Sequence, residues 1–450
     1  MKSYRPYSPD QSELFPPSPR EWLPEGHLAY FVLDVVRELD LTKIEAHYER
    51  ELRGYPPYHP QMMTGLLLYG YCTGVSSSRR IERKTHEDVA FRVLAGGAHP
   101  DHSAIADFRR IHLKALEELF GQVLQLCVKA GLVKLGHVAL DGTKLKASAS
   151  KHKAMSYDRM KAKEKELRER VKALLEAAER EDVFEDEKFG RTRRGDELPE
   201  ELTRAKSRLA KIREAKRALE AEAREQSARE EEERKRKDGG DPPGGASELP
   251  SHRVPREGDK PAPKAQRNFT DADSRIQKSG DGFVQGYNGQ LAVDEGNQII
   301  VAQALTNQPP DAEHLVPMLE QVIERCGRAP DVMTADAGYY SDNNVISARA
   351  LGTDPHIATG RLKRDEPRPR PRGRIPAGLS LKQRMARKLR TLPGALAYAR
   401  RKAVVEPVNG QIKQARGFRQ FLLRGLEKVR GEWALICTGH NLLKLYGATA

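Results

Sequence analysis

Cysteine is scarce in this sequence. The four cysteines among its 450 residues lie far apart, and none forms a C-x-x-C pair: Cys72, Cys127, Cys326 and Cys437. A zinc knuckle or a disulfide framework would need closely spaced pairs. The sequence therefore predicts neither kind of site, and we expect a protein of the reducing cytoplasm.

Long apolar runs are absent, and acidic residues are outnumbered by basic ones. No stretch approaches the roughly 20 apolar residues of a membrane span, and the first residues lack the apolar segment of a signal peptide. Lys and Arg number 78 against 64 Asp and Glu, a formal net charge of +14. This excess favours a polyanionic partner, most commonly nucleic acid, although charge alone leaves a membrane surface as an alternative.

The first third of the chain has the pattern of helices. Proline-rich residues 1–20 are predicted to be a flexible arm, and residues 21–132 a helical DNA-binding domain. Apolar residues recur at helical spacing in 27–39 and 60–74, and one capped helix is predicted over 99–131. A plain helical bundle with a charged surface is an equally good explanation. The exposed basic residues expected to contact DNA in this region are Arg79, Arg80, Arg109 and Arg110.

After residue 132 the pattern becomes that of an α/β fold. The predicted strands are 137–140, 282–294, 297–308, 331–336 and 355–360. Helical patterns at 311–327 and 341–352 separate the last three strands. The order of strand, hairpin, helix, strand, helix and strand predicts a mixed sheet with flanking helices.

Residues 151–265 interrupt that sheet. Between 155 and 237 the sequence is rich in Lys, Glu, Arg and Ala, with apolar residues three or four apart. This spacing predicts two helices that form a charged hairpin or coiled coil. The charged and proline-rich stretch from 229 to 263 is predicted to be a disordered return.

Residues 361–394 form a second insertion, rich in proline and arginine. From residue 361 to 400 there are 13 Lys or Arg and 2 Asp or Glu. This density predicts contacts with DNA phosphates, and a disordered basic linker is the alternative. The arginines expected to make these contacts are Arg368, Arg370 and Arg372.

Three acids are candidates for catalysis because of where they lie. Asp141 and Asp336 each follow an apolar strand, and Glu406 precedes a proline at a helical segment. Converging carboxylates repel one another unless a cation lies between them, and Mg²⁺ prefers such oxygen ligands. Taken singly, Asp141 is better explained as a turn residue and Asp336 as a helix cap, and Glu406 has the alternative of a surface ion-pair partner. Asp294, Asp311 and Asp342, at a turn and two helix starts, are interpreted as structural.

Several blocks of sequence carry a resemblance to a known family. They are VALDGTKLKASAS, GYNGQLAVD, TADAGYYS and VEPVNGQIK, preceded by PQMMTGLLLYGY and HPDHSAIADFRR. Together they resemble bacterial insertion-sequence DDE transposases of the IS-four/IS-five-like superfamily, which have an RNase H-like fold. The resemblance implies a catalytic core composed of residues 133–150 and 266–360, completed by C-terminal helices in 395–450.

The resemblance also implies the chemistry. Asp141, Asp336 and Glu406 would bind two Mg²⁺ ions, for which Mn²⁺ can substitute. The enzyme would cleave DNA as an endonuclease and transfer strands at the terminal inverted repeats of its element and at target DNA. It would act as a homodimer, associated with the bacterial nucleoid and with no membrane.

The family carries a Tyr–Arg–Glu–Lys signature around its glutamate. Tyr398, Arg401, Glu406 and Lys413 match it in type. The gap between Arg401 and Glu406 is one residue longer than usual, so Lys402 competes with Arg401 for that position. Three other functions stay open: a metal-dependent nuclease without strand transfer, an inactive or domesticated DNA-binding derivative, and a coiled-coil scaffold.

Overall fold

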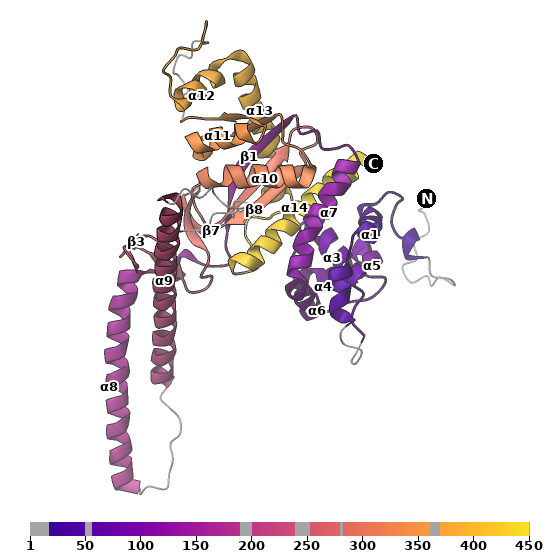
Figure 1. Ribbon diagram of the computed structural model, residues 1–450. Helices are drawn as coiled ribbons and strands as arrows, with labels where there is room; N and C mark the ends of the chain where they lie inside the picture. Colours follow the sequence, from indigo (N-terminus) through magenta and orange to yellow (C-terminus); the bar gives the residue numbers. More distant parts are fainter. Residues whose placement is uncertain are drawn as a thin grey trace, which may run out of the picture. The chain divides into compact units, whose positions relative to one another are not determined.

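The chain forms two compact units (Figure 1). One comprises Met1–Ala130 with Leu435–Ala450, and the other comprises Gly131–Ala434. The structure is a computed structural model that describes residues 18–49, 56–189, 200–238, 253–279, 282–360 and 370–449. Over these ranges it contains no helix that is both long and apolar enough to cross a membrane.

The N-terminal region is helical, as predicted. Pro60 begins one of its helices, where the missing proline N–H costs nothing. The single helix predicted over 99–131 is wrong, because His112 leaves helical geometry and divides it in two. The carboxylate of Asp101 caps the first of these by accepting bonds from the amides of Ser103 (2.8 Å) and Ala104 (3.0 Å). The helices are α1 (Leu28–Glu38), α2 (Thr42–Tyr48), α3 (Pro60–Thr73), α4 (Ser78–Glu87), α5 (Val89–Leu94), α6 (His102–Ile111) and α7 (Leu113–Lys129).

The second unit contains the predicted mixed sheet, with the order β10–β9–β1–β7–β6 and β8 also paired to β7. The central strand β1 runs antiparallel to β7 and parallel to β9. Strand β6, which precedes β7, was not expected from the sequence. The strands are β1 (His137–Lys146), β6 (Arg275–Ser279), β7 (Gly282–Asp294), β8 (Ile300–Thr306), β9 (Val332–Ala335) and β10 (Asp354–Ile357).

Helices flank this sheet as expected. The fully buried Trp433 lies against Gly289 of β7, where an added Cβ would come within 2.9 Å of the indole ring. Only glycine leaves room for this packing. Val429 of the same segment is also buried. The helices are α10 (Leu315–Cys326), α11 (Asp342–Ala350), α12 (Leu381–Arg390), α13 (Leu392–Gly410) and α14 (Leu426–Thr449).

The charged insertion forms a helical hairpin in which α8 (Tyr157–Phe189) lies beside α9 (Glu200–Asp238) (Figure 1). A narrow apolar seam joins the helices, because Met160 and Leu167 of α8 are buried with Ile212 and Leu219 of α9. This is the pairing that the three-to-four spacing predicts.

The prediction of a disordered return after this hairpin is wrong for the described residues. Residues 229–238 belong to α9, and Val254 and Ala265 are buried against the hairpin seam. Residues 239–252 lie outside the described ranges. The short strands at the hairpin base are β2 (Ala154–Ser156) paired with β5 (Gln266–Asn268), and β3 (Arg256–Glu257) paired with β4 (Lys260–Pro261).

The described part of the proline- and arginine-rich insertion is also ordered. Ser380 and Gln383 form a capping box that begins α12. Met385 of this helix is buried, and the Lys388 Nζ donates a hydrogen bond to the carbonyl of Pro355 at 2.9 Å. Residues 381–390 are therefore a packed helix and not a disordered linker.

Candidate active site

The topology of the sheet brings Asp141 and Asp336 to the same rim. Leu140 of β1 is paired with Ala335, the last residue of β9, and the two acids come directly after this pair. The prediction that the strand ends in a turn at Asp141 and Gly142 is wrong, because β1 continues to Lys146 beside β7. Asp141 thus lies where the central strand passes the end of its parallel neighbour.

Burial and neighbouring acids raise the pKa of Asp141. Loss of solvent is the main cause of a pKa of about 6, with Arg401 opposing it and Asp336 and Asp311 adding to it. Helix α13 supplies two side-chain hydrogen-bond donors to this carboxylate. Arg401 Nη1 lies 3.3 Å from Oδ1 and Asn409 Nδ2 lies 3.4 Å from Oδ2. A cation placed between Asp141 and Asp336 would relieve their repulsion.

Asp336 combines a structural role with its place at this rim. Its carboxylate accepts a hydrogen bond of 2.8 Å from the amide of Gly338 and so caps the short 3₁₀ helix Ala337–Tyr339. An added Cβ on Gly338 would lie only 3.0 Å from the Asp336 Oδ1. The glycine therefore keeps the approach to this oxygen open.

Glu406 lies on α13 with an exposed side chain. No hydrogen bond or ion pair joins it to Asp141 or Asp336 within the described ranges. It precedes Asn409 by three residues, so the two share one face of the helix, and Asn409 contacts Asp141. Nowhere in the described residues do three His, Cys, Asp or Glu side chains form a ready metal cage.

Pro407 does not end the helix that carries Glu406. A proline has no N–H for the carbonyl four residues earlier, and here the Gln298 side chain donates to that carbonyl of Ala403 at 3.4 Å. After Gly410 the helix widens into a π-helical turn, Gln411–Ala415, a form that occurs often at functional sites. This turn carries Lys413, whose Nζ donates to the carbonyl of Lys144 at 3.0 Å.

Two known protein families match the sequence of this chain. Residues 250–442 match the family described as Transposase DDE domain, and residues 17–110 match the family described as Transposase domain (DUF772). The chain belongs to the insertion-sequence DDE transposases. No curated protein and no solved structure matches it.

The matched DDE stretch lacks the centre of the transposase's sheet. Strand β1 with Asp141 lies before residue 250, separated from the rest by the helical hairpin. The structure nevertheless inserts β1 between β7 and β9. The hairpin is thus an insertion into a single sheet, and Asp141 lies at the same rim as Asp336.

Two basic residues that were expected to match the family's signature, Arg401 and Lys413, both contact β1. Arg401 is 9% exposed, contacts Asp141 and lies over the ring of Tyr398, with 5.9 Å between guanidinium and ring centroid. Lys402 is exposed. Of the two competing bases, Arg401 is therefore the one that contacts Asp141. Burial lowers the pKa of Lys413, with Asp141 opposing this effect.

A polar network on the opposite face of β1 was missed from the sequence. The Asp311 Oδ1 accepts bonds from Asn288 Nδ2 (2.6 Å), Gln290 Nε2 (2.8 Å) and Lys144 Nζ (3.3 Å). Lys144 is directly opposite Asn288 across the strands, so their side chains share a face. The interpretation of Asp311 as a helix-start acid was incomplete, since its side chain caps nothing. The available signal in the sequence was the pair of amide residues Asn288 and Gln290 in a strand that was expected to be buried. Buried amide groups need hydrogen-bond partners.

This network explains why Gly142 follows Asp141. An added Cβ would lie 2.7 Å from the Asp311 Oδ1 and 2.9 Å from the Gln290 Nε2. Gly142→Ala should therefore lower the free energy of unfolding by about 1–3 kcal/mol through overpacking and reduce DNA cleavage. Urea unfolding and cleavage rates would measure both effects. Gly136→Ala is the control, since its Cβ would meet nothing within 4 Å, and an equal loss in both variants would contradict this explanation.

His314, next to the network, makes the fold sensitive to acid. Burial lowers its pKa to about 4. As pH falls from about 6.5 to 4, the unfolded chain binds the proton first, so about 3 kcal/mol of stability is lost in that window. His314→Gln should lose correspondingly less stability between pH 7 and 4. Fluorescence of Trp433 during urea unfolding, in a Trp22→Phe background, would report this unit, and equal losses would disprove the prediction.

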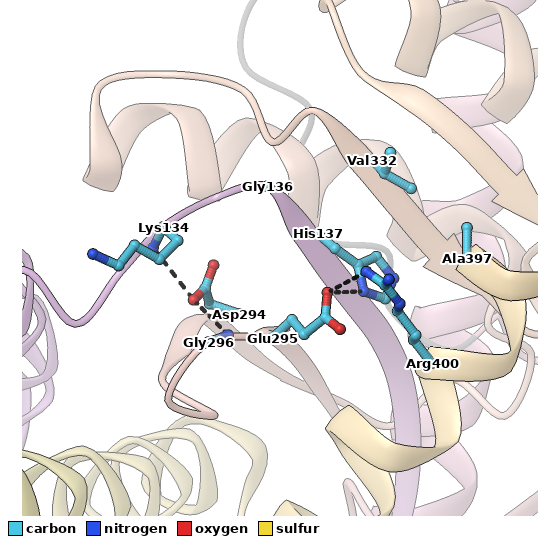
Figure 2. A pocket seen from close by; sticks show the side chains of 9 residues that line it. All are labelled: Lys134, Gly136, His137, Asp294, Glu295, Gly296, Val332, Ala397 and Arg400. Atoms are coloured by element: carbon cyan, nitrogen blue, oxygen red, sulfur yellow. Dashed lines mark hydrogen bonds and ion pairs between the residues drawn. The ribbon is translucent and has the colours of Figure 1, made fainter. Parts of the chain in front are cut away.

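A cavity of about 400 Å³ lies at the other end of the sheet from the acids (Figure 2). It is lined by the first residues of β1 and β9, His137 and Val332. The Glu295 carboxylate lies 3.1 Å from the His137 Nδ1 and 3.5 Å from the Arg400 Nη1. These pairs join β1, the β7–β8 turn and α13. We therefore interpret these side chains as holding the fold together and not as a binding site.

The arginines predicted to contact DNA differ in their surroundings. Arg79 and Arg80 are exposed on α4, and Arg110 is exposed but paired with Asp107 at 2.9 Å. The predicted exposure of Arg109 is wrong: it is 6% exposed and donates to the carbonyl of Ser76 at 2.8 Å, so it holds the loop before α4. Arg368 lies outside the described residues, whereas Arg370 and Arg372 are exposed.

Proposed function

We propose that this transposase binds the terminal inverted repeats of its own mobile element, cleaves the DNA there and transfers the freed 3′-hydroxyl ends to target DNA. The observation that supports the proposal most strongly is that Asp141 and Asp336 lie at the same rim of the sheet, where β9 ends. Helix α13, which bears Glu406, reaches the same rim through Asn409.

The residues at this rim fit magnesium. Asp141 and Asp336 offer carboxylate oxygens, the ligands that Mg²⁺ prefers, and their mutual repulsion favours a cation between them. With Glu406 they would hold the metal. Two bound Mg²⁺ ions, or Mn²⁺ in their place, would activate the attacking water or 3′-hydroxyl and stabilise the leaving oxygen.

The chain's own residues would orient these groups and hold the DNA. Arg401 and Asn409 contact the two oxygens of Asp141, and the Lys413 Nζ contacts the same strand. Phosphate contacts farther from the site fall to exposed arginines. Two copies would act together so that both ends of the element meet. The arginines proposed for phosphate contacts are Arg79, Arg80, Arg110, Arg370 and Arg372.

The test uses labelled duplexes with the inverted repeats that flank the gene, purified protein and Mg²⁺. The proposal expects cleavage at the repeat end and joining of that end to a second duplex. A scrambled repeat of equal length is the control. Cleavage without joining would support a metal-dependent nuclease instead, and binding without cleavage would support an inactive DNA-binding derivative.

A further inference from the structure

The helical hairpin is anchored to the catalytic sheet. Glu222 of α9 forms ion pairs with Arg267 of β5 and Arg275 of β6, and Arg275 is 8% exposed. The Tyr157 hydroxyl, at the start of α8, donates to the Glu220 Oε1 at 2.7 Å. The hairpin therefore stands on β5 and β6, and α8 begins only 16 residues after Asp141 in the sequence.

Charge is unevenly distributed along this hairpin. Residues 158–172 contain seven Lys or Arg and four Asp or Glu, and residues 201–217 contain seven and two, a net charge of +8 together. The two stretches lie side by side, since the Glu164 carboxylate contacts Arg213 (3.2 Å) and Lys216 (2.8 Å). We call these two stretches the basic section. Residues 218–235, by contrast, carry seven Glu and four Lys or Arg.

The basic section carries exposed charges that are not neutralised. Lys206 and Arg217 are exposed and, among the described residues, form no ion pair. They are eleven residues apart, which is three helical turns, so they share one face of α9. Farther along the same helix, Arg229 and Lys235 are paired with glutamates four residues away, at 2.7 and 2.9 Å.

We propose that the basic section binds the phosphates of duplex DNA that extends from the site of cleavage. This inference rests on the proposed function. Fifteen helical residues extend about 20 Å, the length of about six base pairs of duplex. A net positive charge of this length complements the regularly spaced phosphates of a DNA backbone. Such contacts do not depend on the base sequence. The anchoring to β5 and β6 keeps this surface on the same unit as the acids.

The test compares two double variants of α9 that each remove two positive charges. Lys206→Gln with Arg217→Gln removes unpaired charges, and Arg229→Gln with Lys235→Gln removes paired ones. Fluorescence anisotropy without divalent metal would measure binding to repeat duplexes extended beyond the cut by none, six or fifteen base pairs. Wild-type protein should gain affinity with extension. The first variant should lose roughly tenfold at 0.1 M salt on extended DNA, with a salt slope smaller by about 2.

The control variant should bind like the wild type. Equal losses in both variants, or no gain from extension, would overturn the inference. A loss confined to binding of a separate target duplex would overturn it in favour of target-DNA contact. Thermal melting would verify that both variants fold, since all four positions are exposed. Failure of the wild-type protein to bind any repeat duplex would instead refute the proposed function.

Discussion

Asp141→Asn and Asp336→Asn should each lower the rate of DNA cleavage by about 10³-fold or more. Asparagine keeps the shape of the side chain but removes the charge that holds a metal ion, and metal stabilisation of the transition state supplies several kcal/mol. Binding to repeat DNA should persist, because the substitution removes a negative charge near phosphates. Single-turnover cleavage and anisotropy would separate the two effects.

The Asp141 substitution should also leave the free protein at least as stable as the wild type. Its carboxylate has a pKa of about 6 in the fold against an ordinary 3.8. At pH 7 the charged form is therefore less favourable in the folded than in the unfolded chain, because it is buried and lies near other acids. Asp331→Asn is the matched control: Asp331 immediately precedes β9, is exposed and pairs with Arg328 at 3.3 Å. Normal cleavage by either active-site variant would remove that acid from the site.

Glu406→Gln should abolish cleavage to a similar extent. Glu406 makes no contact with the two aspartates, yet it lies one turn before Asn409 on the face of α13 that reaches Asp141. Its carboxylate is exposed, and a metal ion bound by Asp141 and Asp336 would recruit it. Calorimetric titration with Mn²⁺ should show weakened metal binding in this variant, independently of activity.

Glu324→Gln provides the comparison for this experiment, since Glu324 is an exposed glutamate on α10. It should bind Mn²⁺ and cleave DNA like the wild type. If Glu406→Gln cleaved normally, the third carboxylate would have to be another residue. Unchanged Mn²⁺ binding with lost cleavage would assign Glu406 to the positioning of DNA and not to the metal.

The sheet and the meeting of two acids could be predicted because their signals are local. Apolar runs mark the strands, and parallel neighbours end at one rim, so Asp141 and Asp336 had to be close if β1 and β9 paired. The continuation of β1 was not predictable in the same way. Glycine after aspartate usually marks a turn, whereas Gly142 is required here because Asp311 lies over it.

Other errors share a cause, which is dependence on contacts distant in the sequence. Arg109 has the spacing of an exposed residue. It is buried because its guanidinium donates a hydrogen bond to the carbonyl of Ser76, in a loop 33 residues earlier. Val254, in a proline-rich stretch, is ordered because the apolar seam of α8 and α9 covers it. Pro407 stays within a helix because Gln298, more than a hundred residues earlier, satisfies the carbonyl that it leaves open.

The insertion of the hairpin between β1 and its partners also has a consequence for biosynthesis. Asp141 pairs with Leu291, so the central strand emerges 150 residues before its antiparallel neighbour. At about 5–20 residues per second, roughly 10–50 s pass between the synthesis of Asp141 and that of Glu406. Contacts of such separation also close slowly. The contacts within the helical hairpin are close in sequence, so the hairpin can form before β1 has paired with β7 and β9. The rim proposed for catalysis is therefore not assembled until the nascent chain is almost complete.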